Sequence, residues 1–310
     1  MKLYAWRGET PNFGDELNGL IWPALLADFF DEDDREIVLG IGSVLDRRHA
    51  QDRLKIVLGA GYGGYEALPR IDRSWVIHWV RGPLTARKLG LDPALGLGDP
   101  AMLWPFAAGP HPPVGTPGEG PGVKPIGFMP HFESLARGAW AESAEAAGLR
   151  LIDPRANPRD VLAEIAGCRT LISEAMHGAI IADTLGVPWI AVQPQAAIHR
   201  AKWQDWAGAL GLSLRFQTLP PSSLYEWASV SPLATHRLGR RAVEHLAASL
   251  RRAGSQRLVD HAAAALRRIA GGAGQLSPRS ALQRCQERML TCLDAASRHP
   301  RDAYPPVGSA

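Results

Sequence analysis

A glutamate and a histidine, Glu174 and His177, flank a predicted junction between a strand and a helix. The apolar, β-branched run 170–173 predicts a buried strand, and a small-residue helix follows it and ends near Gly186. Ligands bind at this edge of open α/β sheets, and unpaired N–H groups at a helix N-terminus favour an anion. His177 can hold or release a proton near neutral pH, which makes it a candidate catalytic residue. Glu174 can orient that imidazole or cap the helix.

Three further side chains that could bind a ligand follow or flank predicted strands. Arg81 follows the run 75–80, and its planar guanidinium suits a carboxylate or phosphate, or a structural ion pair at a domain interface. His131 comes just after a strand end, where it is a polar rim residue or a ligand. Lys202 precedes two tryptophans and either reaches an anion or extends over an indole ring.

Other motifs are less specific. Asp15 lies near a predicted helix start, where capping is the simpler interpretation. Gly59, Gly61 and Gly64 have the spacing of the dinucleotide fingerprint, but the helix and acidic residue that the fingerprint requires do not follow. We expect a turn or a close backbone approach to a substrate there. The sequence has no P-loop, metalloprotease, nucleophile-elbow or C-x-x-C motif, and nothing in it demands a metal.

The composition predicts a soluble globular protein. The chain has 310 residues, of which 46% are hydrophobic and 21% charged. No apolar run approaches the roughly twenty residues that span a bilayer, and no signal-peptide pattern precedes the first strand. Three cysteines without metal-site spacing fit a reducing, cytoplasmic location. Aromatic and basic residues do not alternate along a sheet, which argues against nucleic-acid binding.

Charge is distributed unevenly along the chain. Residues 1–234 carry 21 Lys and Arg against 26 Asp and Glu, whereas residues 235–310 carry 13 Arg against five acids. A basic helical segment on an acidic body suggests contact with a membrane surface or a lipid phosphate. A solvated helix face is the alternative interpretation.

Strands alternate with helices through most of the chain, which predicts an α/β fold with parallel sheets covered by helices. We expect strands over residues 2–6, 37–41, 55–59, 75–80, 125–129, 149–152, 170–173, 189–192 and 214–219. The second half has the more regular rhythm, with helices predicted over 134–147 and 158–166 and around Lys202.

A segment with five glycines and six prolines, 107–125, predicts a linker between two domains. The expected organisation is an N-terminal Rossmann-like domain, this linker, a C-terminal Rossmann-like domain, a group of C-terminal helices and a disordered tail. Their boundaries are 1–106, 107–125, 126–219, 220–298 and 299–310.

Several segments together resemble the polysaccharide pyruvyl transferase family, most of all the branch that makes pyruvate ketals on bacterial exopolysaccharides such as succinoglycan. They run in family order from about residue 3 to about residue 212, and it is their order and spacing that make the resemblance specific. The segments are 12–18 (NFGDELN), 80–85 (VRGPLT), 98–101 (GDPA), 127–131 (GFMPH), 173–178 (SEAMHG) and 202–206 (KWQDW).

The resemblance implies a GT-B-like architecture of two Rossmann-like domains with a cleft between them. It implies phosphoenolpyruvate as the donor, a sugar of a lipid-linked repeat unit as the acceptor, and no cofactor. His177 matches the family's candidate catalytic residue, with Glu174 beside it, and Arg81 matches its candidate donor-anion ligand. Some relatives have an arginine where this chain has Ala175, so that a donor contact is either missing here or supplied by Lys202 or His131. Further expected substrate-binding residues in the matching segments are Ser173, Gly178, Asn12 and Asp15.

The favoured interpretation is therefore a pyruvyl (ketal) transferase of exopolysaccharide synthesis, cytoplasmic and peripheral on the inner membrane face. A GT-B glycosyltransferase that uses a nucleotide sugar shares the cleft and the anion-binding helix termini. A non-catalytic protein that binds a sugar or a lipid phosphate is the third possibility. Preference for phosphoenolpyruvate over nucleotide sugars, together with turnover, distinguishes the first from the other two.

Overall fold

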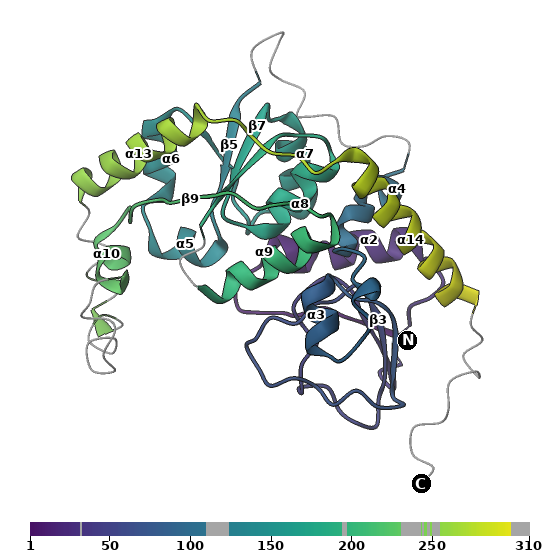
Figure 1. Ribbon diagram of the computed structural model, residues 1–310. Coiled ribbons are helices and arrows are strands. Elements are labelled where there is room, and N and C mark those ends of the chain that lie inside the picture. Colours follow the sequence, from purple (N-terminus) through teal and green to yellow (C-terminus); the bar gives the residue numbers. More distant parts are fainter. Residues whose placement is uncertain are drawn as a thin grey trace.

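The computed structural model describes residues 1–31, 33–109, 124–193, 197–230, 243, 245, 246, 249 and 255–298. The described chain is mixed α/β and contains a four-stranded and a five-stranded sheet. Neighbouring strands in both sheets are parallel, which confirms the predicted fold class at that level. Figure 1 shows the four-stranded sheet below the five-stranded one, with helices between them.

The four-stranded sheet is built in sequence order from the N-terminal part of the chain. Its strands are β1 (Lys2–Tyr4), β2 (Glu36–Leu39), β3 (Leu54–Leu58) and β4 (Trp75–Trp79). Two helices, α1 (Phe13–Glu16) and α2 (Asn18–Leu25), connect β1 to β2. The stretch between β3 and β4 contains no helix. As predicted, the glycines that follow β3 therefore do not form a dinucleotide fingerprint, which needs a helix directly after them.

The five-stranded sheet has the order β6-β5-β7-β8-β9. These strands are β5 (Ile126–Met129), β6 (Arg150–Leu151), β7 (Thr170–Ser173), β8 (Trp189–Val192) and β9 (Phe216–Gln217). Helices alternate with them, as predicted: α5 (Phe132–Arg137), α6 (Trp140–Ala147), α7 (Pro158–Gly167), α8 (Met176–Thr184) and α9 (Ala197–Ala209), followed by α10 (Leu224–Val230). Three strands, β1, β6 and β9, are each at least two residues shorter than predicted.

The single helix predicted over 134–147 is wrong, because the chain forms α5 and α6 with a break at Gly138. Gly138 has extended backbone angles, and the N–H of Ala139 donates to the hydroxyl of Ser222 at 2.9 Å. That hydrogen bond replaces the one a continuous helix would make to a carbonyl four residues earlier. Ser222 is distant in sequence, so the break could not be inferred from the helical pattern.

Short elements follow β4. They are α3 (Pro83–Lys88), two 3₁₀ turns, η1 (Pro93–Leu95) and η2 (Pro100–Leu103), and α4 (Trp104–Ala107). The side chain of Asp99 caps η2 by accepting the N–H of Ala101 at 3.0 Å. Most of the predicted linker, residues 110–123, lies outside the described residues.

Two long helices close the described chain. The first, α13 (Gln256–Ala270), packs against α6 and buries Leu266 and Ile269 with Phe128. The second, α14 (Arg279–Arg298), runs beside the lower sheet in Figure 1, and Gln286 on it donates to the carbonyl of Met102 at 2.7 Å. Between α10 and α13, most of the region in which C-terminal helices were predicted lies outside the described residues, as does the tail from residue 299.

One hydrophobic cluster draws on both sheets. It joins Trp22 and Ile56 from the N-terminal part with Ile180 and Trp206 from the helices above them. Apolar burial of this extent is the main stabilising term in folding and fixes the two sheets relative to each other. The predicted domain boundaries stay a prediction. Of the helices that the structure describes, none is both long and apolar enough to cross a membrane.

Candidate active site

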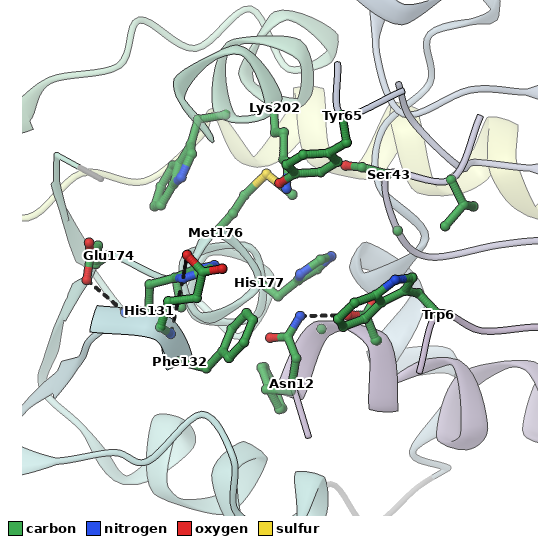
Figure 2. Close-up of a pocket in the computed structure, with 18 of the residues that line it drawn as sticks. Trp6, Asn12, Ser43, Tyr65, His131, Phe132, Glu174, Met176, His177 and Lys202 are labelled. Carbon is green, nitrogen blue, oxygen red and sulfur yellow. Dashed lines mark hydrogen bonds and ion pairs between the residues drawn. The ribbon is translucent and has the colours of Figure 1, made fainter. Parts of the chain in front are cut away.

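A cavity of about 360 Å³ lies between the two sheets. Its walls come from segments that follow the carboxyl ends of β1, β2, β5 and β7, and from α1, α8 and α9. Carboxyl ends of parallel strands are where α/β proteins bind ligands, and here two sheets present such ends to one space. Figure 2 shows the side chains that line it, with His177 near the middle.

His177 is the second residue of α8, at the helix end where backbone N–H groups lack intrahelical partners. Its Nε2 lies 3.5 Å from Oδ2 of Asp99, which belongs to the N-terminal part of the chain. Nδ1 of the ring lies against Gly14 so closely that a Cβ there would overlap it. The imidazole therefore lies between a carboxylate and a backbone surface.

Asp99 is fully buried, which by itself would raise the pKa of its carboxyl group. The adjacent His177, the N–H of Ala101 and the charge of Arg81 outweigh burial, so that the pKa lies below its usual value. Asp99 is therefore ionised, and its carboxylate lies next to the imidazole of His177. A carboxylate that orients a histidine in this way is the arrangement of a general acid or base.

Lys202, on α9, faces His177 across the cavity (Figure 2). Its Nζ lies 4.4 Å from the ring centroid of Tyr65, a cation–π contact. Burial lowers the pKa of Lys202 to about 7, with Arg81 adding to the effect and Asp15 opposing it. A bound anion would favour the charged form of this lysine, so the side chain can bind a phosphate or carboxylate beside His177.

Asn12 and Asp15 line the cavity from α1. The Asn12 amide donates to Oδ2 of Asp15 at 2.6 Å. Burial raises the pKa of Asp15 above its usual value, although Asn12, His177 and Lys202 act in the opposite direction. The capping role predicted for Asp15 is wrong, because α1 has no side-chain cap hydrogen bond; its carboxylate instead adds a proton-accepting oxygen to the wall of the cavity.

Glu174 and His131 also line the cavity, and a hydrogen bond joins their two segments. The Glu174 carboxylate accepts the N–H of His131 at 2.8 Å and the hydroxyl of Ser134 at 2.9 Å, which anchors the start of α5. The carboxylate that lies next to His177 is Asp99. Glu174 does not cap α8, which has no side-chain cap hydrogen bond, and instead joins the end of β7 to the residues that begin α5. His131 itself caps α5 through Nδ1.

Arg81 is placed behind the cavity wall. Its side chain is fully buried, and Nε donates to Oδ2 of Asp205 at 3.2 Å. Its other nitrogens donate to the hydroxyl of Ser43 at 2.8 Å and to the carbonyl of Tyr62 at 3.2 Å. Ser43 lines the cavity whereas Arg81 does not. These contacts correspond to the second alternative for Arg81, a structural ion pair.

Ser173 and Gly178 shape the start of α8 without lining the cavity. The Ser173 hydroxyl donates to the carbonyl of Ala175 at 2.7 Å. A Cβ at Gly178 would lie 2.5 Å from the sulfur of Met129 and 2.7 Å from the hydroxyl of Ser173. Both residues let α8 approach the sheet closely, which brings His177 to its position.

Sequence reasoning did not assign roles to several residues of this region. Asp99 was part of a matching segment, and its place between a glycine and a proline was the available signal. Arg48 lines the cavity and donates from Nε to Asp46 at 2.7 Å, but no pattern in the sequence marks it. Two exposed aromatic side chains at the cavity, Trp6 and Tyr65, were also missed because aromatic rings normally predict core packing.

The assembled groups can exchange protons and bind anions. In the part of the chain that the structure describes, no three His, Cys, Asp or Glu side chains gather as metal ligands would. Metal independence stays a prediction. The His177–Asp99 pair can serve as acid or base, and Lys202 with the first turn of α8 can bind a negatively charged group.

Two comparisons with known proteins bear on the family of this chain. The profile of the polysaccharide pyruvyl transferase family matches residues 12–195, a range that includes Asp99, His177 and the end of β8. The chain is also 36% identical over 324 aligned residues to the succinoglycan biosynthesis protein ExoV of Rhizobium meliloti (strain 1021). That alignment covers 96% of this chain and 99% of the relative.

Proposed function

The chain belongs to the polysaccharide pyruvyl transferase family and is therefore a transferase, and we propose that it moves the pyruvyl group of phosphoenolpyruvate onto a sugar of a lipid-linked exopolysaccharide repeat unit. Two hydroxyls of that sugar become bridged as a ketal, and phosphate is released. The family match and the similarity to the succinoglycan biosynthesis protein both support polysaccharide pyruvylation. The donor and the lipid-linked acceptor are our proposal.

One observation carries this proposal: His177, with Asp99 at Nε2, faces Lys202 across a cavity at the N-terminus of α8. Phosphoenolpyruvate has a carboxylate and a phosphate, and both require cations or free N–H groups. Its transfer also requires a proton donor next to the anion. The cavity offers these groups together.

The reaction needs three proton movements. His177 protonates the methylene carbon of the donor, which leaves a positive, oxocarbenium-like centre at the neighbouring carbon. A sugar hydroxyl forms a C–O bond to that carbon and loses its proton, and the bond to the phosphate oxygen breaks. A second hydroxyl of the same sugar then closes the ring. The two hydroxyl protons balance the one gained by the new methyl group and the one carried away by phosphate.

The side chains around His177 assist these steps. Asp99 stabilises the imidazolium before it gives up its proton. Lys202 and the first turn of α8 stabilise the charge that builds up on the departing phosphate. Asp15, whose pKa is raised by burial, accepts a proton from an attacking hydroxyl.

We also propose that the two sheets are the Rossmann-like domains of a GT-B-like architecture. The location of the cavity, between the carboxyl edges of two parallel sheets, supports this. A change in small-angle X-ray scattering on addition of phosphoenolpyruvate would show whether the two domains close on the donor.

Peripheral binding to the inner membrane face is a further part of the proposal. The exposed arginines of the last two helices support it, among them Arg257, Arg268 and Arg284. Reversing these three charges to glutamate should abolish sedimentation with vesicles of anionic phospholipid and leave the fold intact. Unchanged sedimentation would leave this face as a solvated surface.

The decisive experiment is calorimetric titration with phosphoenolpyruvate and a panel of nucleotide sugars. We expect selective binding of phosphoenolpyruvate, weaker binding by a Lys202→Met variant, and phosphate release only when an acceptor is present. His177→Gln should bind phosphoenolpyruvate yet release no phosphate. Selective binding of a nucleotide sugar would refute the proposed donor.

A further inference from the structure

The cavity has two chemically different sides, which Figure 2 makes visible. Lys202 lies on one side of His177, while Trp6, Asn12 and Phe132 lie on the other. A donor with two anionic groups belongs on the side of Lys202. The opposite side offers aromatic rings, an amide and a carboxylate, so it suits a different ligand.

Trp6 is unusual because it is a large aromatic ring left 37% exposed at a catalytic cavity. It follows β1, and its ring lies so close to Gly8 that a Cβ there would overlap it. The ring is thereby supported by backbone on one side. An exposed aromatic surface beside a catalytic group marks a binding site rather than a packing residue.

Phe132 lies across the cavity from Trp6 and is the first residue of α5. Its ring contacts that of His131, with centroids 4.7 Å apart. Glu174 anchors the start of α5 through the N–H of His131 and the hydroxyl of Ser134, so the position of the Phe132 ring is fixed by a buried carboxylate. The two aromatic rings are therefore held in place before any ligand binds.

Asn12 lies between these two rings in Figure 2 and is bonded to Asp15 through its amide nitrogen. This geometry leaves the amide oxygen of Asn12 to accept a hydroxyl. The neighbouring Asp15 carboxylate also accepts hydroxyl protons and repels an anion. A ligand with apolar C–H faces and hydroxyl edges, but without negative charge, matches this set of groups.

We propose that Trp6, Asn12 and Phe132 form the acceptor subsite and bind a neutral pyranoside ring. The apolar face of the sugar lies on the Trp6 indole, its far edge contacts Phe132, and two hydroxyls face His177 and Asp15. The inference rests on the proposed function, because it identifies the class of acceptor. It also explains the order of groups in the cavity, since His177 lies between donor and acceptor.

The test separates sugar binding from donor binding. Saturation-transfer NMR with methyl pyranosides of glucose, galactose and mannose, and with their disaccharides, is recorded with and without phosphoenolpyruvate. We expect Trp6→Ala and Phe132→Ala each to weaken saccharide binding about five- to tenfold. Phosphoenolpyruvate affinity, measured by calorimetry, should stay within about twofold of the wild-type value.

Matched controls come from exposed aromatic residues away from the cavity. Trp227 on α10 is 53% exposed and Phe106 on α4 is 48% exposed, and neither lines the cavity. Trp227→Ala and Phe106→Ala should bind saccharides as the wild type does. Trp6→Phe should restore part of the affinity that Trp6→Ala loses.

The outcomes distinguish this inference from the proposed function. If both Trp6→Ala and Phe132→Ala bind saccharides as well as the wild type, or the wild type binds none of them, the subsite is refuted. If saccharide binding depends on Trp6 while phosphoenolpyruvate does not bind, the proposed donor is refuted and the subsite stands.

Discussion

Oδ2 of Asp99 lies 3.5 Å from Nε2 of His177, although the two residues belong to different halves of the chain. Asp99 immediately precedes the turn η2, and His177 lies in the first turn of α8. The candidate acid–base group therefore exists only when both halves are folded and packed together. Substitutions in either half of the chain should therefore alter activity.

Asp99→Asn should lower kcat by about 10²- to 10⁴-fold, because the neutral amide no longer stabilises a protonated His177. The melting temperature should change little, since the Asn side-chain oxygen still accepts the N–H of Ala101. Phosphate release and thermal unfolding measure the two quantities. Asp92→Asn is the control, because Asp92 caps η1 in the same manner and is exposed. Equal kcat values for both variants would contradict the role of Asp99.

Gly14→Ala should lower activity by about 10²-fold or more while the protein stays folded. The new methyl group would overlap Nδ1 of His177 and displace the imidazole from Asp99. Gly19→Ala is a matched change in the adjacent helix α2, where a Cβ meets nothing within 4 Å. We expect it to keep full activity and to gain about 0.5–1 kcal/mol of stability. Steady-state kinetics and urea unfolding of both variants test this.

Affinity for phosphoenolpyruvate should fall as the pH rises through about 7, because burial lowers the pKa of Lys202 to about 7. Below that pH the lysine is charged and attracts the anion, and above it most of the free protein carries a neutral lysine. Binding above pH 7 should therefore take up a proton, which calorimetry detects in buffers of different ionisation enthalpy.

Lys202→Met should remove this proton uptake and weaken binding at pH 6 by about tenfold or more. Lys88→Met is the matched control, since Lys88 lies 5.0 Å from the Tyr62 ring centroid in a similar cation–π contact, but does not line the cavity. Proton uptake that persists in Lys202→Met would assign the titration to another group.

Asp205→Ala should destabilise the protein by about 3–5 kcal/mol, because it leaves the buried Arg81 guanidinium without its carboxylate. Arg81→Met should cost less, since Asp205 still accepts the N–H groups of Leu84 and Thr85 and the hydroxyl of Thr85. Denaturant unfolding of both single variants and the double variant gives the coupling energy.

Asp294→Ala, which breaks the exposed pair with Arg298, should leave the unfolding midpoint unchanged. If Arg81→Met proved as stable as the wild type and only donor affinity fell, Arg81 would have to reach the ligand directly. Its buried position behind Ser43 predicts the opposite.

The sequence by itself determined most of the local elements and identified the candidate catalytic side chain, His177. Alternation of apolar strands with helices predicted most of the five-stranded sheet. The run from Thr170 to Gly178 placed His177 at the start of a helix after a strand. These features depend on residues close in sequence, whose backbone preferences and periodicity are visible directly.

Only the tertiary structure decided which groups surround that side chain. Glu174 is near His177 in sequence, yet its carboxylate bonds to the start of α5, while Asp99 arrives from the other half of the chain. Arg81 has the chemistry of an anion ligand, but Asp205 and Ser43 hold it behind the wall of the cavity. Such partners are determined by packing between segments far apart in sequence. The local sequence pattern does not show which distant segments pack together.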